Sequence, residues 1–325
     1  MHTPIIDDIV LVASTARRPH DGYKTLMSGH DMPKAISNRI LLYSLRKLCG
    51  TVHYYTSIES FVDNINAHKD HIIFPYYYAV GSRINHSYVQ SICESNGIKF
   101  IGPESYALTV CNDKVLSKDI CRAKSISTPN CAVIYTETDE PVLDFLRVPI
   151  IVKPVFEGNS IGISRDSICN SYAEARDRAK WLYSKILAPI MLEEYIEGTE
   201  INICMIGNSK NPPQINTVAL DRKGALYDYR QKHSRLSLSR YKPYGGDEIE
   251  QEKKKFYDIF SMLGKVEFMR IDCILGNEGI SCIELTPDAD LSINSALYKS
   301  ISSEMSYIEF LNFLIQNSIE SYKNL

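Results

Sequence analysis

FMRIDCILGNEGISCIELTPDADLSINS, residues 268–295, is the most informative stretch of this 325-residue sequence. Two runs of alternating apolar residues, 268–275 and 280–285, flank the segment Gly-Asn-Glu-Gly at 276–279. Such runs are typical of half-buried strands, and a short glycine-containing segment between them predicts a β-hairpin. The buried side of this hairpin would carry the apolar residues Met269, Ile271, Cys273 and Ile283.

This hairpin would bring two carboxylates together. If it is centred on Glu278, Asp272 lies opposite Glu284, and Arg270 lies opposite Thr286 one pair farther from the turn. Like charges directly opposite each other across an antiparallel pair repel, so two acids on a half-buried sheet need a cation. Their oxygen atoms suit Mg²⁺ held jointly with substrate phosphates, and the alternative is an exposed hairpin whose acids are screened by water.

Length and composition exclude several classes of protein. A chain of 325 residues, 44% hydrophobic and 23% charged with a net charge of −3, predicts two or three packed globular units. This charge gives no electrostatic footprint for nucleic acid, and no apolar run approaches the roughly 18 residues of a membrane span. The N-terminus lacks the basic region of a signal peptide. Nine scattered cysteines without a C-x-x-C pair indicate reduced thiols in the cytoplasm, rather than disulfides or a zinc site.

The predicted strands and helices divide the chain into three parts. Residues 1–102 alternate strands with helices, which predicts an α/β domain with a parallel sheet. Residues 103–190 form a second, smaller unit of helices and short strands, including a helix over 112–123 that starts near Asn112 or Asp113. Residues 191–325 form a third unit, whose sheet begins with a strand at 191–196 and is completed by the hairpin. Within it, 221–246 is a long polar loop of the kind that serves as a functional lid.

A second informative segment spans residues 150–164. It predicts a strand ending at Lys153, a turn rich in small residues at 157–162, and a further strand at 160–164. Small residues let backbone N–H groups approach an anion closely, and a lysine supplies a point charge for phosphate. An ordinary glycine-rich hairpin beside a lysine is the alternative. The sequence contains no Walker A, G-x-G-x-x-G or H-E-x-x-H motif, which excludes the common competing nucleotide and zinc motifs.

Five segments taken together resemble the ATP-grasp ligases, and within them the D-alanine–D-alanine ligase family. They are NDKVLSK (112–118), VKPVFEGNSIGIS (152–164), LEEYIEGTEI (192–201), YDYRQKH (227–233) and RIDCILGNEGISCIELTPDADLSINS (270–295). They occur in the family order and at family-like spacings. The resemblance implies an N-terminal α/β domain followed by two ATP-grasp subdomains of α+β type, with the nucleotide between them.

The resemblance also implies roles in binding ATP and one or two Mg²⁺ ions, for which Mn²⁺ is an alternative. The residues that match nucleotide-binding positions are the phosphate lysines Lys114 and Lys153, the adenine segment Glu193, Tyr195 and Ile196, the ribose acid Glu200, and Ile283 beside the adenine. The residues that match metal-binding positions are Asp272, Glu284 and Thr286, the last replacing a family asparagine.

Catalytic and substrate-binding positions follow from the same resemblance. Arg270 matches the arginine that stabilises the reacting carboxyl oxygens, Lys232 a lysine of the lid, and Ser160 the flexible glycine-rich loop. Ser295 stands where the family binds the carboxylate of the amine-donating amino acid, and His233 where it has a lid tyrosine. A histidine at that lid position also resembles the D-alanine–D-lactate ligases.

The reaction implied by the resemblance has two steps. A substrate carboxylate attacks the γ-phosphate of ATP to give an acyl phosphate and ADP, and an amine then displaces phosphate. Catalysis of this kind is mainly positioning and charge neutralisation, with a closing lid that excludes water. The partners are therefore a small-molecule carboxylate and an amino acid, and family analogy allows a homodimer through the N-terminal domain.

Departures from the family pattern concentrate at the first substrate. The family glutamate that binds the ammonium of the first D-alanine corresponds to Met32, or to Asp31 after a shift of one residue. In the segment 79–86, the histidine and acids that the family has at its matching positions are replaced. The family turn Leu-Pro-Gly is replaced by Asp288-Ala289-Asp290, where an extra acid would either support the metal or repel a carboxylate. Residues 76–78 are three tyrosines that would either enlarge the site or serve packing.

These departures predict a ligase whose first substrate is not D-alanine, as in specialised metabolism. One alternative is a divergent D-alanine–D-alanine or D-alanine–D-lactate ligase of cell-wall synthesis. A second alternative, from a different class, is an ATP-binding protein without ligase activity, which Thr286 and the altered turn would favour and the five matching charged residues oppose: Lys114, Lys153, Arg270, Asp272 and Glu284.

Overall fold

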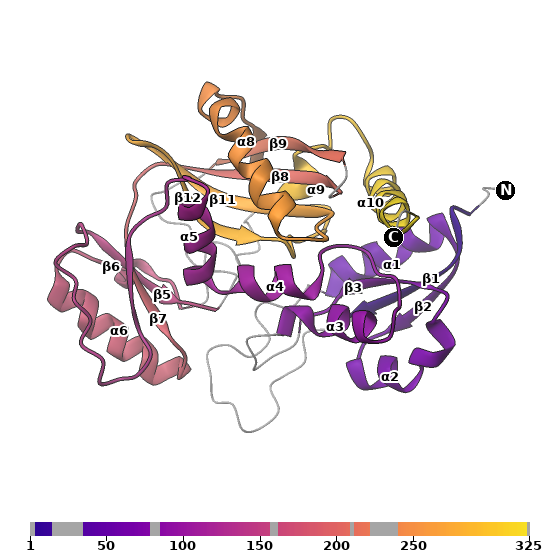
Figure 1. The fold of residues 1–325 in the computed structure, drawn as a ribbon, viewed down its shortest axis with the longest axis horizontal. Helices are drawn as coiled ribbons and strands as arrows, with labels where there is room; N and C mark the ends of the chain where they lie inside the picture. The colour runs from indigo at the N-terminus through magenta and orange to yellow at the C-terminus, as the bar shows by residue number, and fades with distance from the viewer. Residues whose placement is uncertain are drawn as a thin grey trace.

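The computed structural model describes residues 4–14, 35–78, 85–156, 162–208, 211–221 and 240–323. Over these residues the chain forms three β-sheets flanked by helices, and Figure 1 shows them in chain order from indigo to yellow. None of the helices in this part of the chain is long and apolar enough to span a membrane.

The N-terminal part forms a three-stranded parallel sheet, as the alternation of strands and helices predicts. The strand order is β2 (Cys49–Tyr55), β1 (Ile6–Ala13) and β3 (Ile72–Tyr76). The helical elements around it are α1 (Ala35–Leu48), α2 (Ile58–Asp63), α3 (Tyr88–Ser95) and the short 3-10 helices η1 (Ile65–His68) and η2 (Asn85–Ser87).

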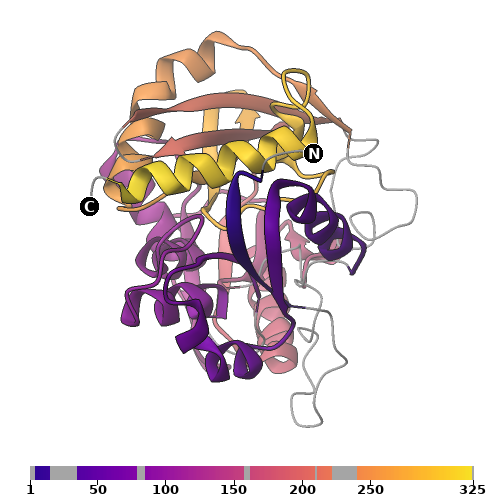
Figure 2. The same cartoon turned by 90° about the vertical axis from the view of Figure 1, so that its right-hand side faces the viewer.

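The central strand β1 is covered on both faces, which explains its continuous apolar sequence. Ile9 and Leu11 pack in one cluster with residues of α1 and of the C-terminal helix α10 (Tyr307–Tyr322). Val10 and Val12 pack in a second cluster with residues of α2 and α3. Figure 2 shows α10 lying between the N-terminal sheet and the C-terminal sheet, so the last helix joins the two ends of the chain.

The middle of the chain forms a four-stranded antiparallel sheet in the order β4-β7-β5-β6. Its strands are β4 (Cys131–Ile134), β7 (Ile190–Glu194), β5 (Ile150–Pro154) and β6 (Ile168–Cys169). Helix α6 (Tyr172–Ile186) packs on this sheet through Ala175, Ala179 and Leu182 (Figure 1).

Two expectations for this region are wrong. The strand predicted at 191–196 does not begin the third sheet, because β7 pairs with β4 on one side and β5 on the other. An apolar run predicts a strand but does not say which sheet the strand joins. No strand forms over 162–164, the described part of the strand predicted at 160–164; the chain instead enters the 3-10 helix η3 (Arg165–Ser167).

Two helices connect the N-terminal part to the middle sheet. They are α4 (Ser105–Asn112) and α5 (Lys114–Ala123). The predicted helix start is confirmed: the side chain of Asp113 caps α5 by accepting hydrogen bonds from the backbone N–H groups of Val115 and Leu116. This cap places Lys114 in the first turn of α5.

The C-terminal part forms a five-stranded sheet in the order β10-β9-β8-β11-β12. Its strands are β8 (Thr199–Asn208), β9 (Asn211–Asp221), β10 (Arg240–Pro243), β11 (Phe268–Gly276) and β12 (Gly279–Thr286). Helix α8 (Asp247–Met262) covers one face through Phe256, Ile259 and Phe260, which pack against Met269 and Ile271. The opposite face packs against α10 and the short helix α9 (Ala296–Lys299).

Candidate active site

The hairpin of β11 and β12 forms, and its register is as predicted at the two carboxylates. Asp272 pairs with Glu284, and Arg270 pairs with Thr286. Met269, Ile271 and Cys273, on the opposite side of β11, are fully buried, as expected from the alternation, whereas Ile283, which was expected to be buried with them, is half-buried. The strand pair therefore brings two acids, an arginine and a threonine to one side of the sheet.

The turn of this hairpin differs from the prediction. Gly276 pairs with Gly279, so the turn has two residues and is not centred on Glu278. With that turn alone, Asp272 would pair with Ile283 and the two carboxylates would point to opposite faces. A bulge next to Asp272 leaves Ile283 as an extra residue in β12 and restores the carboxylate pairing. Ile283 is half-buried, and its predicted place beside adenine stays a prediction.

Each of the two carboxylates has a basic partner in the structure. The Nε and Nη2 atoms of Arg270 donate to the two carboxylate oxygens of Asp272 at 2.5 and 2.8 Å, and Asn202 Nδ2 donates to Asp272 Oδ1 at 2.9 Å. Lys114 Nζ lies 3.2 Å from Glu284 Oε1. The sequence predicts that a metal relieves the repulsion between Asp272 and Glu284. In the structure, Arg270 and Lys114 already neutralise the two carboxylates.

Electrostatic effects keep these groups ionised. Burial acts to raise the pKa of Glu284, but the charges of Lys114, Arg270 and Lys153 outweigh it, and the pKa lies below its ordinary value. Burial acts to lower the pKa of Arg270, but the Asp272 carboxylate outweighs it, and the pKa lies well above its ordinary value. Glu284 is thus negatively charged at neutral pH.

A second cluster holds one buried carboxylate between two lysines. Glu193 Oε1 lies 2.6 Å from Lys153 Nζ, and Glu193 Oε2 lies 2.5 Å from Lys118 Nζ. The Lys118 ammonium also donates to Thr128 Oγ1 and to the carbonyl of Pro129. Burial acts to raise the pKa of Glu193, but the charges of Lys118 and Lys153 lower it by more than burial raises it. The pKa therefore lies below its ordinary value. This arrangement fixes the position of the Lys153 ammonium.

Lys118 was not identified from the sequence, although a signal was available. It lies four residues after Lys114 on α5, so the two lysines share one side of the helix. Its side chain is only 1% exposed. A lysine is almost never this buried without a partner, and the partner lies 75 residues away in β7.

The predicted adenine and ribose residues lie where the middle sheet meets the C-terminal sheet. Tyr195 and Ile196 follow β7 directly, and the Tyr195 N–H donates to the Pro149 carbonyl at 2.9 Å. Glu200 lies in β8 opposite Ile274 of β11. These roles stay predictions.

Thr286 lies opposite Arg270 beside the carboxylate pair, and Ser295 is buried at the start of α9. Thr286 Oγ1 is buried and has no hydrogen-bond partner among the described residues. Ser295 caps α9 by accepting a bond from the Tyr298 N–H at 3.2 Å, which is compatible with its hydroxyl donating to a substrate carboxylate. A buried hydroxyl without a partner is unfavourable, so Thr286 is suited to contact a ligand or metal here.

The turn after β12 is bound by the N-terminal domain. Tyr76 Oη donates to Asp290 Oδ1 at 2.7 Å, and Tyr78 Oη donates to the Asp288 carbonyl at 2.9 Å. His86 Nδ1 forms a short hydrogen bond with Asp288 Oδ2. Burial raises the pKa of Asp288, but His86 lowers it more, so Asp288 is ionised at neutral pH.

These contacts show what two of the three tyrosines at 76–78 do in the structure. Tyr76 and Tyr78 bind the two aspartates that replace the family turn, across more than 200 residues of sequence. Together with neighbouring apolar side chains they line a pocket between the N-terminal sheet and the turn, whose residues include Tyr77, His86, Gln90, Ile101, Phe268 and Leu291. The sequence did not indicate His86 as part of this site.

Several predicted residues lie outside the described part of the chain. They are Ser160 of the glycine-rich loop, Lys232 and His233 of the lid, and Met32 of the first-substrate segment. Their roles stay predictions.

Comparison with known proteins identifies relatives. A family model described as D-ala D-ala ligase C-terminus matches residues 125–288, about half of the chain. The D-alanine--D-alanine ligase of Cupriavidus pinatubonensis is 27% identical over 59% of this chain and 58% of its own length. That of Nitrosospira multiformis is 31% identical over 59% of this chain and 61% of its own length. The chain thus matches about three-fifths of the length of these curated relatives.

Solved structures resemble the whole chain. The D-alanine--D-alanine ligase from Bacillus anthracis complexed with ATP has a TM-score of 0.74 at 20% identity, covering 98% of both chains. The VanG D-Ala:D-Ser ligase from Enterococcus faecalis has a TM-score of 0.68 at 16% identity, covering 96% of this chain and 99% of its own. These similarities confirm the predicted fold class, an α/β N-terminal domain followed by an ATP-grasp part.

Proposed function

The chain belongs to the D-alanine–D-alanine ligase family, and from this premise we propose that it catalyses ATP- and Mg²⁺-dependent joining of a carboxylate to an amine. The observation that carries the proposal is the hairpin register, which sets Asp272 beside Glu284 with Arg270 bound to the first and Lys114 to the second. Oxygen ligands next to lysines and an arginine are suited to a nucleotide–metal complex.

The proposed reaction proceeds through an acyl phosphate. An oxygen of the substrate carboxylate attacks the γ-phosphorus of ATP, the bond to the β,γ-bridging oxygen breaks, and ADP leaves. The amine nitrogen then attacks the acyl carbon, the tetrahedral intermediate expels phosphate, and the nitrogen loses a proton. Negative charge gathers first on the phosphoryl oxygens and then on the carbonyl oxygen, so basic groups positioned beforehand lower both barriers.

The contacts of Lys114 and Lys153 support a role for both lysines in phosphate binding. An ammonium carries three N–H donors, and the bond to Glu193 uses one donor of Lys153. Glu193 is itself held by Lys118, so the Lys153 side chain loses little further freedom when it binds an anion. Lys114 bridges the Val155 carbonyl after β5 and Glu284 on β12, and therefore links the two sheets.

The residues at the carboxylate pair fit a divalent cation. Asp272, Glu284 and Thr286 offer oxygen atoms, which Mg²⁺ prefers, and the buried Thr286 hydroxyl gains a partner if a metal or its water lies there. When bound, such a metal neutralises charge on the transferred phosphoryl group. Arg270 donates to both oxygens of Asp272 and Asn202 donates to Oδ1, which leaves a lone pair of Oδ2 for a metal, so Asp272 can serve Arg270 and a metal together.

D-alanine is the first candidate for both substrates. The curated relatives named above are D-alanine--D-alanine ligases, and this supports the cell-wall type of reaction more than a ligase of specialised metabolism. A second candidate is a different first substrate, because Tyr76, Tyr78 and His86 hold an acidic turn at the edge of the pocket. An ionised acid at this edge attracts an ammonium and repels a carboxylate.

One experiment separates these candidates. The full-length protein is incubated with ATP, Mg²⁺ and a panel of carboxylates and amino acids, and both ADP release and product mass are measured. ADP release with D-alanine alone, with a dipeptide product, supports the first candidate. ADP release only with another pair supports the second. ATP binding without ADP release from any pair would contradict the proposal and indicate a protein that binds ATP without ligase activity.

A further inference from the structure

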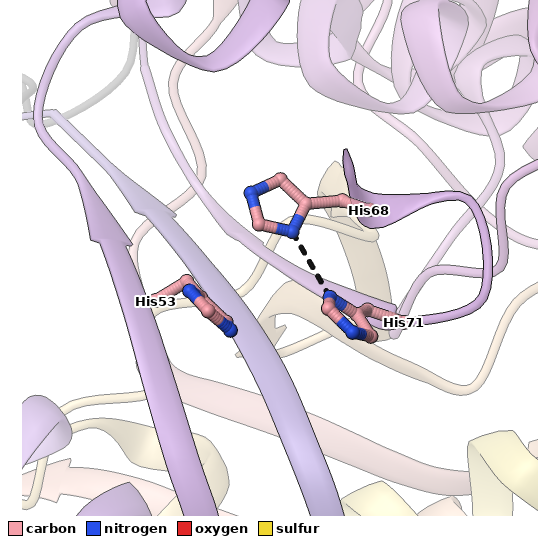
Figure 3. Close-up of side chains that lie close together, drawn as sticks. All are labelled: His53, His68 and His71. Carbon is pink, nitrogen blue, oxygen red and sulfur yellow. Dashed lines mark hydrogen bonds between the residues drawn. The ribbon is translucent and has the colours of Figure 1, made fainter. Parts of the chain in front are cut away.

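Three histidines meet in the N-terminal domain, at the opposite end of β3 from the pocket. His53 lies in β2, His68 ends η1, and His71 directly precedes β3. One nitrogen of each ring lies within 4.8 Å of the corresponding nitrogen of the other two, and Figure 3 shows the three rings side by side. The five residues of β3 place this cluster about 17 Å from the Tyr76 end of the strand.

The ring nitrogens are arranged so that two of them compete for one proton. His68 Nδ1 and His71 Nδ1 lie 2.9 Å apart (Figure 3). If both rings carry their proton on Nε2, two lone pairs face each other at that distance, which is unfavourable without a cation between them. Two histidine nitrogens bound to one tetrahedral Zn²⁺ lie about 3.3 Å apart, so this pair needs to open by only a few tenths of an ångström.

The His68 ring has a hydrogen-bonded oxygen partner on its outer nitrogen, as metal-bound histidines do, and an Asp8 carboxylate oxygen lies near each of the other two rings. His68 Nε2 lies 2.7 Å from Tyr55 Oη. His71 Nε2 lies 4.0 Å from one Asp8 oxygen, and His53 Nε2 lies 3.6 Å from the other. An oxygen that accepts a hydrogen bond from the outer N–H of a metal-bound histidine fixes the tautomer and directs the inner lone pair at the metal.

Access and protonation suit the entry of an ion. The His53 and His71 side chains are 36% and 25% exposed, whereas His68 is buried. The His53 and His71 rings are stacked, with an interplanar angle of 12°. Burial lowers the pKa of His68, as do the neighbouring rings of His53 and His71, and a neutral ring is the form that binds metals.

We propose that His53, His68 and His71 form a Zn²⁺ site in which each ring supplies one nitrogen and water completes a tetrahedron. Tyr55 orients the His68 ring, and the nearby Asp8 carboxylate supplies negative charge beside His53 and His71. Imidazole nitrogens suit Zn²⁺ rather than Mg²⁺, so this site is chemically distinct from the oxygen-rich carboxylate pair. Because the ligands come from β2, η1 and the start of β3, bound Zn²⁺ would hold these elements together and stabilise the domain.

The test is Zn²⁺ binding to the full-length protein without an affinity tag, by isothermal titration calorimetry and by the visible absorption of bound Co²⁺. We expect one ion per chain, a tetrahedral Co²⁺ spectrum without a thiolate band, and a higher melting temperature with Zn²⁺. The double variant His53→Gln/His71→Gln should bind at least about 100-fold more weakly and lose the Zn²⁺-dependent rise in melting temperature.

Matched variants separate this site from adventitious binding. His2→Gln/His20→Gln removes the same number of histidines elsewhere and should bind Zn²⁺ as tightly as the wild type. Tyr55→Phe keeps all three ligands and should weaken binding about 10-fold, which provides a readout if the double variant does not fold. Unchanged binding by the double variant, no binding by the wild type, or a Co²⁺ spectrum with a thiolate band would each overturn the proposal. None of these measurements depends on ligase activity.

Discussion

Two sides of the candidate active site are built from different kinds of contact. On the nucleotide side, basic side chains bind acids within the ATP-grasp part; its members are Lys114, Lys118, Lys153, Glu193 and Glu284. On the turn side, side chains of the N-terminal domain bind the two aspartates that follow β12; its members are Tyr76, Tyr78, His86, Asp288 and Asp290.

This difference shows which part of the site is adaptable. In the proposed function, a nucleotide and its metal would exchange partners with the lysine–carboxylate pairs of the nucleotide side, and the same charges would then serve the structure before binding and the ligand afterwards. On the turn side, hydrogen bonds join the N-terminal domain to the turn after β12 at the edge of the pocket. Substrate choice is therefore expected to depend on the turn side, and phosphoryl transfer on the nucleotide side.

The largest effect is expected from Glu284→Gln. Glutamine replaces an anionic oxygen with a neutral amide oxygen, which binds a metal more weakly, and it leaves Lys114 without its acid, so the rate of ADP release should fall about 1,000-fold. Glu278→Gln at the exposed turn of the same hairpin is the matched control and should leave the rate unchanged. Retained activity in Glu284→Gln would show that Glu284 does not bind the metal, and that phosphoryl transfer does not depend on the nucleotide side as proposed.

Glu193→Gln tests whether the nucleotide side is held together by charge. The variant leaves Lys118 and Lys153 buried without a compensating acid, which should lower the free energy of unfolding at pH 7 by about 3 kcal/mol. Because the folded pKa of Glu193 is depressed, its contribution is present above its unfolded pKa and is lost as the pH falls through the folded value.

Urea unfolding at pH 7 and at successively lower pH measures this effect. The difference in stability between wild type and Glu193→Gln should be largest at neutral pH and should shrink as the wild-type carboxyl becomes protonated. Glu197→Gln, close to the same strand, serves as a control. A difference that stays constant with pH would show that packing, not charge, makes Glu193 important.

Tyr76→Phe tests the turn side. It removes the donor to Asp290, a bond to a charged group worth about 1.5 kcal/mol, so the KM for the carboxylate substrate should change about 10-fold while the KM for ATP stays the same. Tyr106→Phe, at an exposed tyrosine, should change neither constant. Equal changes in both KM values would mean that the turn side affects ATP binding as much as it affects binding of the carboxylate substrate.

The smallest effect is expected from Thr286→Asn, which restores the family residue at this position. An amide oxygen reaches farther than the buried hydroxyl, so the Mg²⁺ concentration needed for half-maximal ADP release should fall a few-fold. Mg²⁺ titrations at fixed ATP measure this. A higher Mg²⁺ requirement would indicate that Thr286 Oγ1 contacts a substrate rather than the metal.

Local patterns predicted individual elements better than the contacts between them. The start of α5 at Asp113, the parallel N-terminal sheet and the pairing of Asp272 with Glu284 all follow from short-range spacing. The hairpin turn was predicted one residue too long, and the bulge at Ile283 compensated for that error. The carboxylate prediction was therefore right although part of its reasoning was wrong.

The sequence by itself determined the types of residue in the site, the order of the strands along the chain and the family to which they point. Those properties depend on alternation, caps and motifs, which act over a few residues. Only the tertiary structure decided that β7 joins the middle sheet, that Lys118 reaches Glu193, that His86 binds Asp288, and that His53 meets His68 and His71. Such contacts depend on which buried surfaces pack together, and many apolar surfaces share the same period, so spacing along the chain does not specify them.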